Sequence, residues 1–165
     1  MTAFDWTALQ AARDATADEI PEMVDRALRF LEDLLVGINH VCTFTLTSGP
    51  LLGDLTTGVN ALLPKDCAVS RLAPVSSWPA LVDAALPGLF LPGEPAYAWA
   101  EKMPARQLAE AVAGWVVALL RRLWPGSVQS WELTVDTRQW YEGVYVDLVV
   151  RRDDRVWLLH LGLSD

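Results

Sequence analysis

The sequence is poor in the residues from which disulfide frameworks and metal sites are built. It has two cysteines and two histidines in 165 residues, and neither cysteine stands in a CxxC or Cys/His metal spacing. We therefore expect no metal and no cofactor, and no disulfide framework holding the fold. Cys42 and Cys67 are interpreted as buried thiols, with a bond between them as the alternative.

The sequence also lacks a hydrophobic run long enough to cross a bilayer. The longest run, residues 111–120, is bounded by Glu110 and Arg121 and is half the length that a bilayer requires. Residues 1–16 lack the basic start and the apolar segment of a signal peptide. These absences predict a cytoplasmic protein that has no membrane partner.

Basic residues are scarce as well. The chain has 13 basic and 21 acidic side chains and a net charge of −8. Binding to a phosphate backbone requires clustered Lys and Arg, so nucleic acid is not an expected partner. Eight acids and three arginines lie in residues 1–37. A basic partner would meet this region first, although a charged, solvated helix face is the ordinary reason for such a pattern.

About half of the residues, 52%, are apolar, which suffices for a sizeable core. No repeat or linker divides the chain, and helix signals precede strand signals, so we predict one α+β domain over residues 1–165. Residues 50–103 are the least determined part, apart from a helix that begins at Ser77 and ends before Pro87. The other expected elements are N-terminal helices at 5–16 and from Pro21 to about 36, a strand near 38–47, a long core helix near 104–124, and a C-terminal three-stranded antiparallel β-meander at 131–136, 144–151 and 155–163.

The chain has eight tryptophans, several times the usual number for its length. Trp115 lies on the apolar face of the long helix and is predicted to be a core residue. Trp6, Trp99 and Trp140 stand at a helix start or in turns, where exposure is expected. Exposed tryptophans are typical anchors of protein interfaces because they bury a large rigid area.

A search for catalytic motifs assigns no catalytic residue. The glycines between residues 49 and 58 do not match the phosphate-binding GxxxxGK[ST] spacing. A catalytic triad would need His40 or His160 as its base, because these are the only histidines. His40 and Cys42 lie two residues apart on one strand, so they form either a thiol–imidazole pair or part of the core. The sequence leaves both pairs, His40 with Cys42 and Asp147 with His160, open as sites.

The segment from Val144 to Gly162, VYVDLVVRRDDRVWLLHLG, resembles the central hairpin of the PD-(D/E)XK nucleases. The resemblance implies that Asp147 stands at the metal-binding aspartate. His160 stands where that family has a glutamate, and Gly162 where it has the lysine that activates water. These departures imply an inactive relative, or a degenerate hydrolase that uses Asp147, His160 and Glu132. The alternative is an ordinary hairpin in which Asp147 faces solvent.

Two classes of function follow from these patterns. The first is a non-catalytic protein-binding protein, such as a small acidic immunity protein, antitoxin, chaperone or adaptor, whose partner is a protein and basic in charge. The second is the degenerate nuclease-like domain. The sequence also leaves a homo-oligomer open. The helix that begins at Pro21 is expected to turn its acids outward, and three tryptophans are expected to be exposed. The predicted binding residues are therefore Trp6, Asp25, Glu32, Asp33, Trp99 and Trp140.

Overall fold

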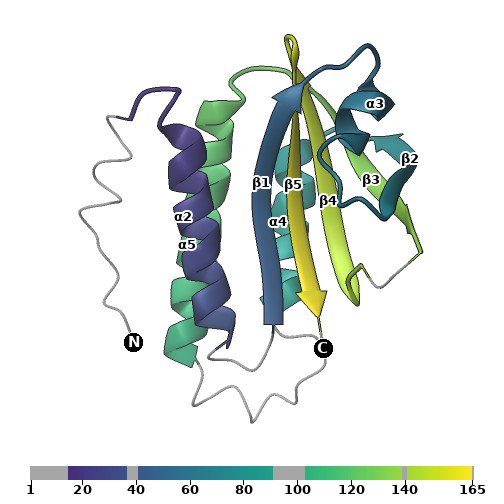
Figure 1. Ribbon diagram of the computed structural model, residues 1–165. Helices are drawn as coiled ribbons and strands as arrows, with labels where there is room; N and C mark the ends of the chain where they lie inside the picture. Colours follow the sequence, from purple (N-terminus) through teal and green to yellow (C-terminus); the bar gives the residue numbers. More distant parts are fainter. Residues whose placement is uncertain (1–14, 37–40, 91–102, 139–140, 165) are drawn as a thin grey trace.

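The computed structural model describes residues 15–36, 41–90, 103–138 and 141–164, which form helices and a single sheet (Figure 1). The predicted first helix and residues 91–102 lie outside the described residues. The elements, in chain order, are α2 (Ile20–Val36), β1 (Val41–Pro50), α3 (Leu55–Asn60), β2 (Cys67–Pro74), α4 (Trp78–Phe90), α5 (Met103–Leu123), β3 (Gln129–Thr137), β4 (Val144–Arg152) and β5 (Arg155–Ser164).

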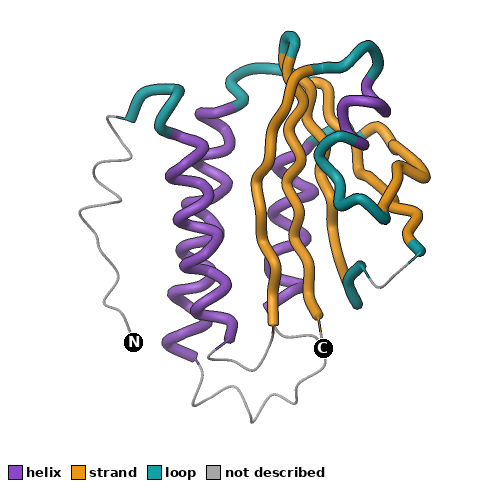
Figure 2. Tube along the Cα trace, in the orientation of Figure 1, coloured by secondary structure: helices purple, strands orange, loops and turns teal. Residues whose placement is uncertain are grey.

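The five strands form an antiparallel sheet in the order β1-β5-β4-β3-β2. The predicted meander of β3, β4 and β5 is therefore present, and the sheet extends beyond it at both edges. β1 pairs with β5 along its whole length, and β2 pairs with β3. Figure 2 shows the strands as one layer beside the helices.

The helices α2, α4 and α5 cover one face of the sheet, and α3 lies on the other (Figure 1). β5 is buried on both faces because it lies between β1 and β4 and is covered from both sides. Its alternate residues divide accordingly. Leu159 and Leu161 pack into the helix-side core, whereas Val156 and Leu158 pack beneath α3.

The helix α2 forms because its apolar residues recur at helical spacing. Val24, Leu28, Leu31 and Leu35 are fully buried. The helix packs against β1 and α5, and α5 packs chiefly against α2 and α4. No helix in the described ranges is long and apolar enough to span a bilayer.

Three tryptophans pack against one another in the helix-side core. The Trp124 ring meets the Trp78 ring edge-on at 5.1 Å and the Trp157 ring at 6.4 Å between centroids. All three are buried, and Trp124 is 1% exposed. The prediction that Trp115 belongs to the core was wrong in degree, since Trp115 is half-buried at the edge of the core.

The segment between β1 and β2 folds over the opposite face of the sheet. Asp54 caps α3 by accepting a hydrogen bond from the Thr57 N–H at 2.8 Å. Val59 and Leu63 then pack on Leu133 and Leu158 to form a second, smaller apolar cluster. Neither α3 nor β2 was predicted, because residues 50–103 were the least determined part of the sequence apart from the helix at Ser77.

The predicted fold class is confirmed as a single α+β arrangement with an antiparallel sheet. Two boundaries were wrong. The strand predicted near 38–47 does not end before Ser48, since β1 continues to Pro50. Pro87 and Gly88 do not end α4, which continues to Phe90. A proline within a helix removes one hydrogen bond without always ending the helix.

Candidate functional site

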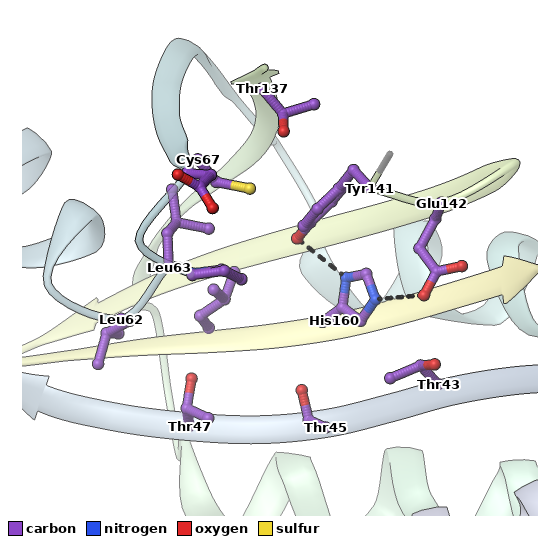
Figure 3. Close-up of a pocket in the computed structure, with 13 residues that line it drawn as sticks. Thr43, Thr45, Thr47, Leu62, Leu63, Cys67, Thr137, Tyr141, Glu142 and His160 are labelled. Atoms are coloured by element: carbon purple, nitrogen blue, oxygen red, sulfur yellow. Dashed lines mark hydrogen bonds and ion pairs between the residues drawn. The ribbon is translucent and has the colours of Figure 1, made fainter. Parts of the chain in front are cut away.

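A cleft of about 540 Å³ opens on the face of the sheet that carries α3 (Figure 3). Its floor is formed by β1 and β5, and its walls by the segment that joins α3 to β2 and by the segment that enters β4. The lining residues include three threonines of β1, the polar groups of Tyr141, Glu142 and His160, and an apolar wall made of Leu62, Leu63, Pro64 and Leu158.

The strand register explains why polar side chains meet here. Thr45 of β1, His160 of β5 and Asp147 of β4 are direct partners in neighbouring strands, so their side chains share one face of the sheet. Thr43 lies opposite Gly162 in the next row, and Thr47 lies opposite Leu158. The three threonine side chains are exposed and form the β1 side of the cleft.

Asp147 lies beneath the cleft and is completely buried. Its Oδ1 lies 2.6 Å from His160 Nδ1, and its Oδ2 accepts a hydrogen bond of 2.8 Å from the Tyr141 hydroxyl. A buried carboxylate requires such partners. The expectation that Asp147 faces solvent is therefore wrong. The strand β4 is an interior strand, and both of its faces are covered at this position.

These bonds fix the orientation of His160. An ionised Asp147 only accepts hydrogen bonds, so Nδ1 of the imidazole carries the hydrogen that points to Asp147. Burial, followed by the charge and hydrogen bond of Asp147, raises the pKa of the Tyr141 hydroxyl above its ordinary value of 10, so this hydroxyl remains a donor. The 3.2 Å contact between the Tyr141 hydroxyl and Nδ1 is then secondary to their two bonds with Asp147.

The second ring nitrogen of His160 faces the cleft and Glu142 (Figure 3). Nε2 lies 3.7 Å from Glu142 Oε1, which is too far for a hydrogen bond. Both side chains are nearly buried, with 10% of His160 and 8% of Glu142 exposed. Within the described part of the chain, neither Nε2 nor Oε1 has a hydrogen-bond partner, although the Ser164 hydroxyl donates to Glu142 Oε2.

Gly162 makes room for this arrangement. A Cβ atom at position 162 would lie 2.6 Å from His160 Nε2 and 2.7 Å from Glu142 Cγ. These distances are shorter than real Cβ contacts, so any larger residue would displace Glu142 or the imidazole. A glycine inside a strand often marks such a close approach.

The two cysteines lie on opposite faces of the sheet and are both free. The alternative of a disulfide is therefore wrong. Cys42 is buried as predicted, and burial, followed by the charges of Glu32 and Glu142, raises the pKa of its thiol to about 12. Cys67 is half-buried and lines the cleft, which corrects its interpretation as a buried thiol.

The predicted binding residues fall into two groups. Trp6, Trp99 and Trp140 lie outside the described residues. The other three are on α2, where Asp33 is exposed and Asp25 is half-buried in an ion pair of 2.8 Å with Arg29. Their role in binding remains a prediction.

Glu32, the third acid of that group, has a structural role in addition. Its Oε1 accepts a hydrogen bond of 2.5 Å from the backbone N–H of Phe44 in β1. The side chain is half-buried rather than turned outward, and burial raises its pKa above the ordinary value of 4.5 against the opposing effect of that bond. Glu32 thus ties α2 to the outermost strand of the sheet.

The residues implied by the nuclease resemblance are only partly brought together. Asp147 and His160 are adjacent, but Glu132 is exposed and its partner in β4 is Leu148, a residue of the helix-side core. No group of three or more His, Cys, Asp or Glu among the described residues could hold a metal ion. Glu142 also fills the space above Gly162 in which that family's lysine would lie. His40 lies outside the described residues, so its pairing with Cys42 is untested.

Sequence reasoning missed Tyr141 and Glu142. The available signal was Gly162, a glycine inside a buried strand, which indicates that another group approaches closely. Chemically, the cleft presents an oriented imidazole nitrogen, the carboxylates of Glu142 and Asp66, and several hydroxyls beside an apolar wall, a composition that is typical of sites for polar ligands. No protein-family model, curated protein or solved structure matches the chain.

Proposed function

We propose that this chain is a non-catalytic protein-binding protein that engages a basic protein partner, in the manner of small acidic immunity proteins, antitoxins, chaperones or adaptors. The observation that carries the proposal is the charge of the cleft. Glu142 and Asp66 line it, and Asp147 lies beneath it. Among the described residues that line it there is no lysine or arginine. The resulting field favours a cationic group.

The acidic face of α2 supports the same partner. Residues 15–36 contain six acids and two arginines, a net charge of −4. Arg26 and Arg29 are paired with Glu22 and Asp25, and both pairs lie on the outer side of the helix. Each pair is neutral as a unit, so the net negative charge of this segment is carried by Asp18, Glu19, Glu32 and Asp33.

Both acidic regions border β1. The helix α2 packs against β1 on one face of the sheet (Figure 1). The threonines of β1 line the cleft on the other face. A partner that covers this edge reaches both. Association of two copies strand to strand is disfavoured at Phe44, because Glu32 already accepts its edge N–H. We therefore favour a different protein over a homo-oligomer. We further propose a cytoplasmic setting, which the two free cysteines support.

The test is a comparison of two exposed helical aspartates. Immobilised wild-type protein, Asp33→Lys and the matched control Asp83→Lys, an exposed position on α4, are used to capture partners from the native host, and association rates are measured with the purified partner. We expect Asp33→Lys to associate more slowly than the wild type and Asp83→Lys to associate at the wild-type rate. We also expect the partner's affinity for the wild type to fall as salt rises. A partner whose rate ignores both Asp33→Lys and salt would contradict electrostatic recognition through α2.

The second candidate is the degenerate nuclease-like domain, which the adjacency of Asp147 and His160 favours. Such a domain would act on nucleic acid only if a metal were held, and Mg²⁺ prefers several oxygen ligands. Incubation of purified protein with DNA or RNA and Mg²⁺ or Mn²⁺ tests this. We expect no cleavage. Cleavage that is lost in Asp147→Asn, at unchanged folding, would replace our proposal with this one.

A further inference from the structure

We propose that the cleft holds the guanidinium group of an arginine side chain, which, on the proposed function, the basic partner presents. The argument begins with what is incomplete in the site. Glu142 is a nearly buried carboxylate, and its Oε1 has no hydrogen-bond donor among the described residues. Trp124 Nε1 is the only fully buried side-chain polar atom without a partner among the described residues, so Glu142 Oε1 keeps some access to solvent through the cleft. A donor from outside the chain can therefore reach this oxygen and replace water there.

His160 independently indicates the same position. Its side chain is nine-tenths buried, and its Nδ1 is committed to Asp147. Nε2 is therefore a fixed polar atom that faces the cleft without a hydrogen bond of its own. A nitrogen donor at about 2.9 Å from each acceptor reaches both Nε2 and Oε1, because the two atoms are only 3.7 Å apart.

The balance of charge selects a cation over a neutral amide. Asp147, Glu142 and Asp66 carry three negative charges at or beneath the cleft. No lysine or arginine is among the described lining residues, so the three carboxylates leave the site negative. In a partly desolvated cleft, this charge attracts a cationic donor and disfavours an anion.

The shape and the lining favour arginine. Leu62, Leu63 and Leu158 offer an apolar wall for the methylene stem of a long basic side chain. At the polar end, a guanidinium has five N–H donors in one plane, which suits acceptors spread over Glu142, His160 and the threonine hydroxyls. The Tyr141 ring also borders the cleft, and arginine stacks on aromatic rings.

The experiment uses two capped glycine pentapeptides, one with a central arginine and one with the neutral, nearly isosteric citrulline. Binding to the full chain is followed by the NMR signals of the His160 ring. We expect the arginine peptide to bind at least tenfold more tightly. Glu142→Gln should abolish this preference, whereas Glu132→Gln, an exposed glutamate of β3 on the other face, should preserve it. Equal binding of the two peptides, or a preference that survives Glu142→Gln, would overturn the inference.

Two further arms separate this inference from the proposed function. Agmatine, a free guanidinium compound, is titrated in parallel, and binding as tight as that of the peptide would overturn a protein as the source of the group. Thermal melts confirm that Glu142→Gln is folded. If a basic protein partner is captured equally well by wild type and Glu142→Gln, the function stands and the guanidinium site fails. If the arginine peptide binds but no protein partner exists, the reverse holds.

Discussion

The two faces of the sheet are covered to different extents. On the helix side, α2, α4 and α5 supply a continuous apolar core that includes Trp78, Trp124 and Trp157. On the other side, α3 covers only one end with a small apolar cluster, and the rest is the cleft, where Asp147 and His160 take positions that leucine or valine would otherwise fill. The first face supplies stability, and the second keeps polar groups in fixed positions.

This comparison shows how a strand serves both purposes at once. In β5, residues of one parity, such as Leu159 and Leu161, are core residues, and residues of the other parity, His160 and Gly162, form the site. Because the side-chain period of a strand is two, a change at one residue acts on one face. Substitutions at exposed positions of the cleft face should therefore affect binding, whereas substitutions at buried positions of either face should affect stability.

The largest effect is expected on the helix side. Trp124→Ala should lower the free energy of unfolding by about 3–5 kcal/mol, because it leaves a cavity between Trp78 and Trp157. Urea denaturation measures this loss. Trp115→Ala is the matched control, and only about 1–2 kcal/mol is expected because Trp115 is half-buried. Equal losses for the two variants would show that the Trp124 cluster is not the centre of the core.

On the cleft side, Asp147→Asn should lower the free energy of unfolding by about 2–3 kcal/mol. The amide cannot accept from both His160 and Tyr141, so one of their buried donors is left without a partner. Asp136→Asn, at an exposed position of β3, serves as the control and should change stability by less than about 0.5 kcal/mol. An Asp147→Asn variant as stable as that control would mean that Asp147 is solvated.

Smaller changes in the free energy of unfolding, of opposite sign, are expected at two glycines. They test how closely Glu142 and His160 approach Gly162 in β5. Gly162→Ala should cost about 1–3 kcal/mol because its Cβ would collide with Glu142 and His160. Gly114→Ala, at an exposed position of α5 with open space around it, should stabilise the protein by about 0.4–1 kcal/mol. Thermal or urea unfolding of both variants measures these changes. If Gly162→Ala left the free energy of unfolding unchanged, Glu142 could not lie against Gly162.

The smallest effect is expected in the reactivity of the two thiols, one of which lies on each face of the sheet. The pKa of Cys42 is raised to about 12, so almost no thiolate is present below about pH 10. Cys67 lines the cleft. In native protein at pH 8, iodoacetamide should modify Cys67 and leave Cys42 intact, as peptide mass spectrometry would show. Both should react in urea, and rapid modification of native Cys42 would contradict its burial.

Much of the fold was predictable because its signals are local. The apolar spacing of α2 and α5 and the two-residue alternation along β4 follow from helix and strand periods that the sequence displays directly, whereas β5 is a nearly continuous apolar run between polar turns. β2 was not predictable, because Cys67–Pro74 is a half-exposed edge strand with a bulge between Val69 and Arg71. Its structure depends on pairing with β3 rather than on its own pattern.

The site was predictable only in part, since its members meet through tertiary structure. Asp147 and His160 were singled out together because their hairpin resembles that of the PD-(D/E)XK nucleases. Their partners were missed, because Gly162 indicates only that some group approaches β5 closely and does not identify Tyr141 and Glu142. Glu32 shows the opposite failure: its helical position predicted an outward side chain, but the outermost strand lies close enough to bind it.

The most direct test of the division between the faces places a cation of the chain's own in the cleft. Thr45 is exposed and lies directly opposite His160, so an arginine there would occupy the position that we assign to the partner. Isothermal titration should show that Thr45→Arg binds the captured partner at least tenfold more weakly than the wild type does. Its free energy of unfolding should change by less than about 0.5 kcal/mol. Unchanged affinity in the folded variant would contradict the cleft as the binding site.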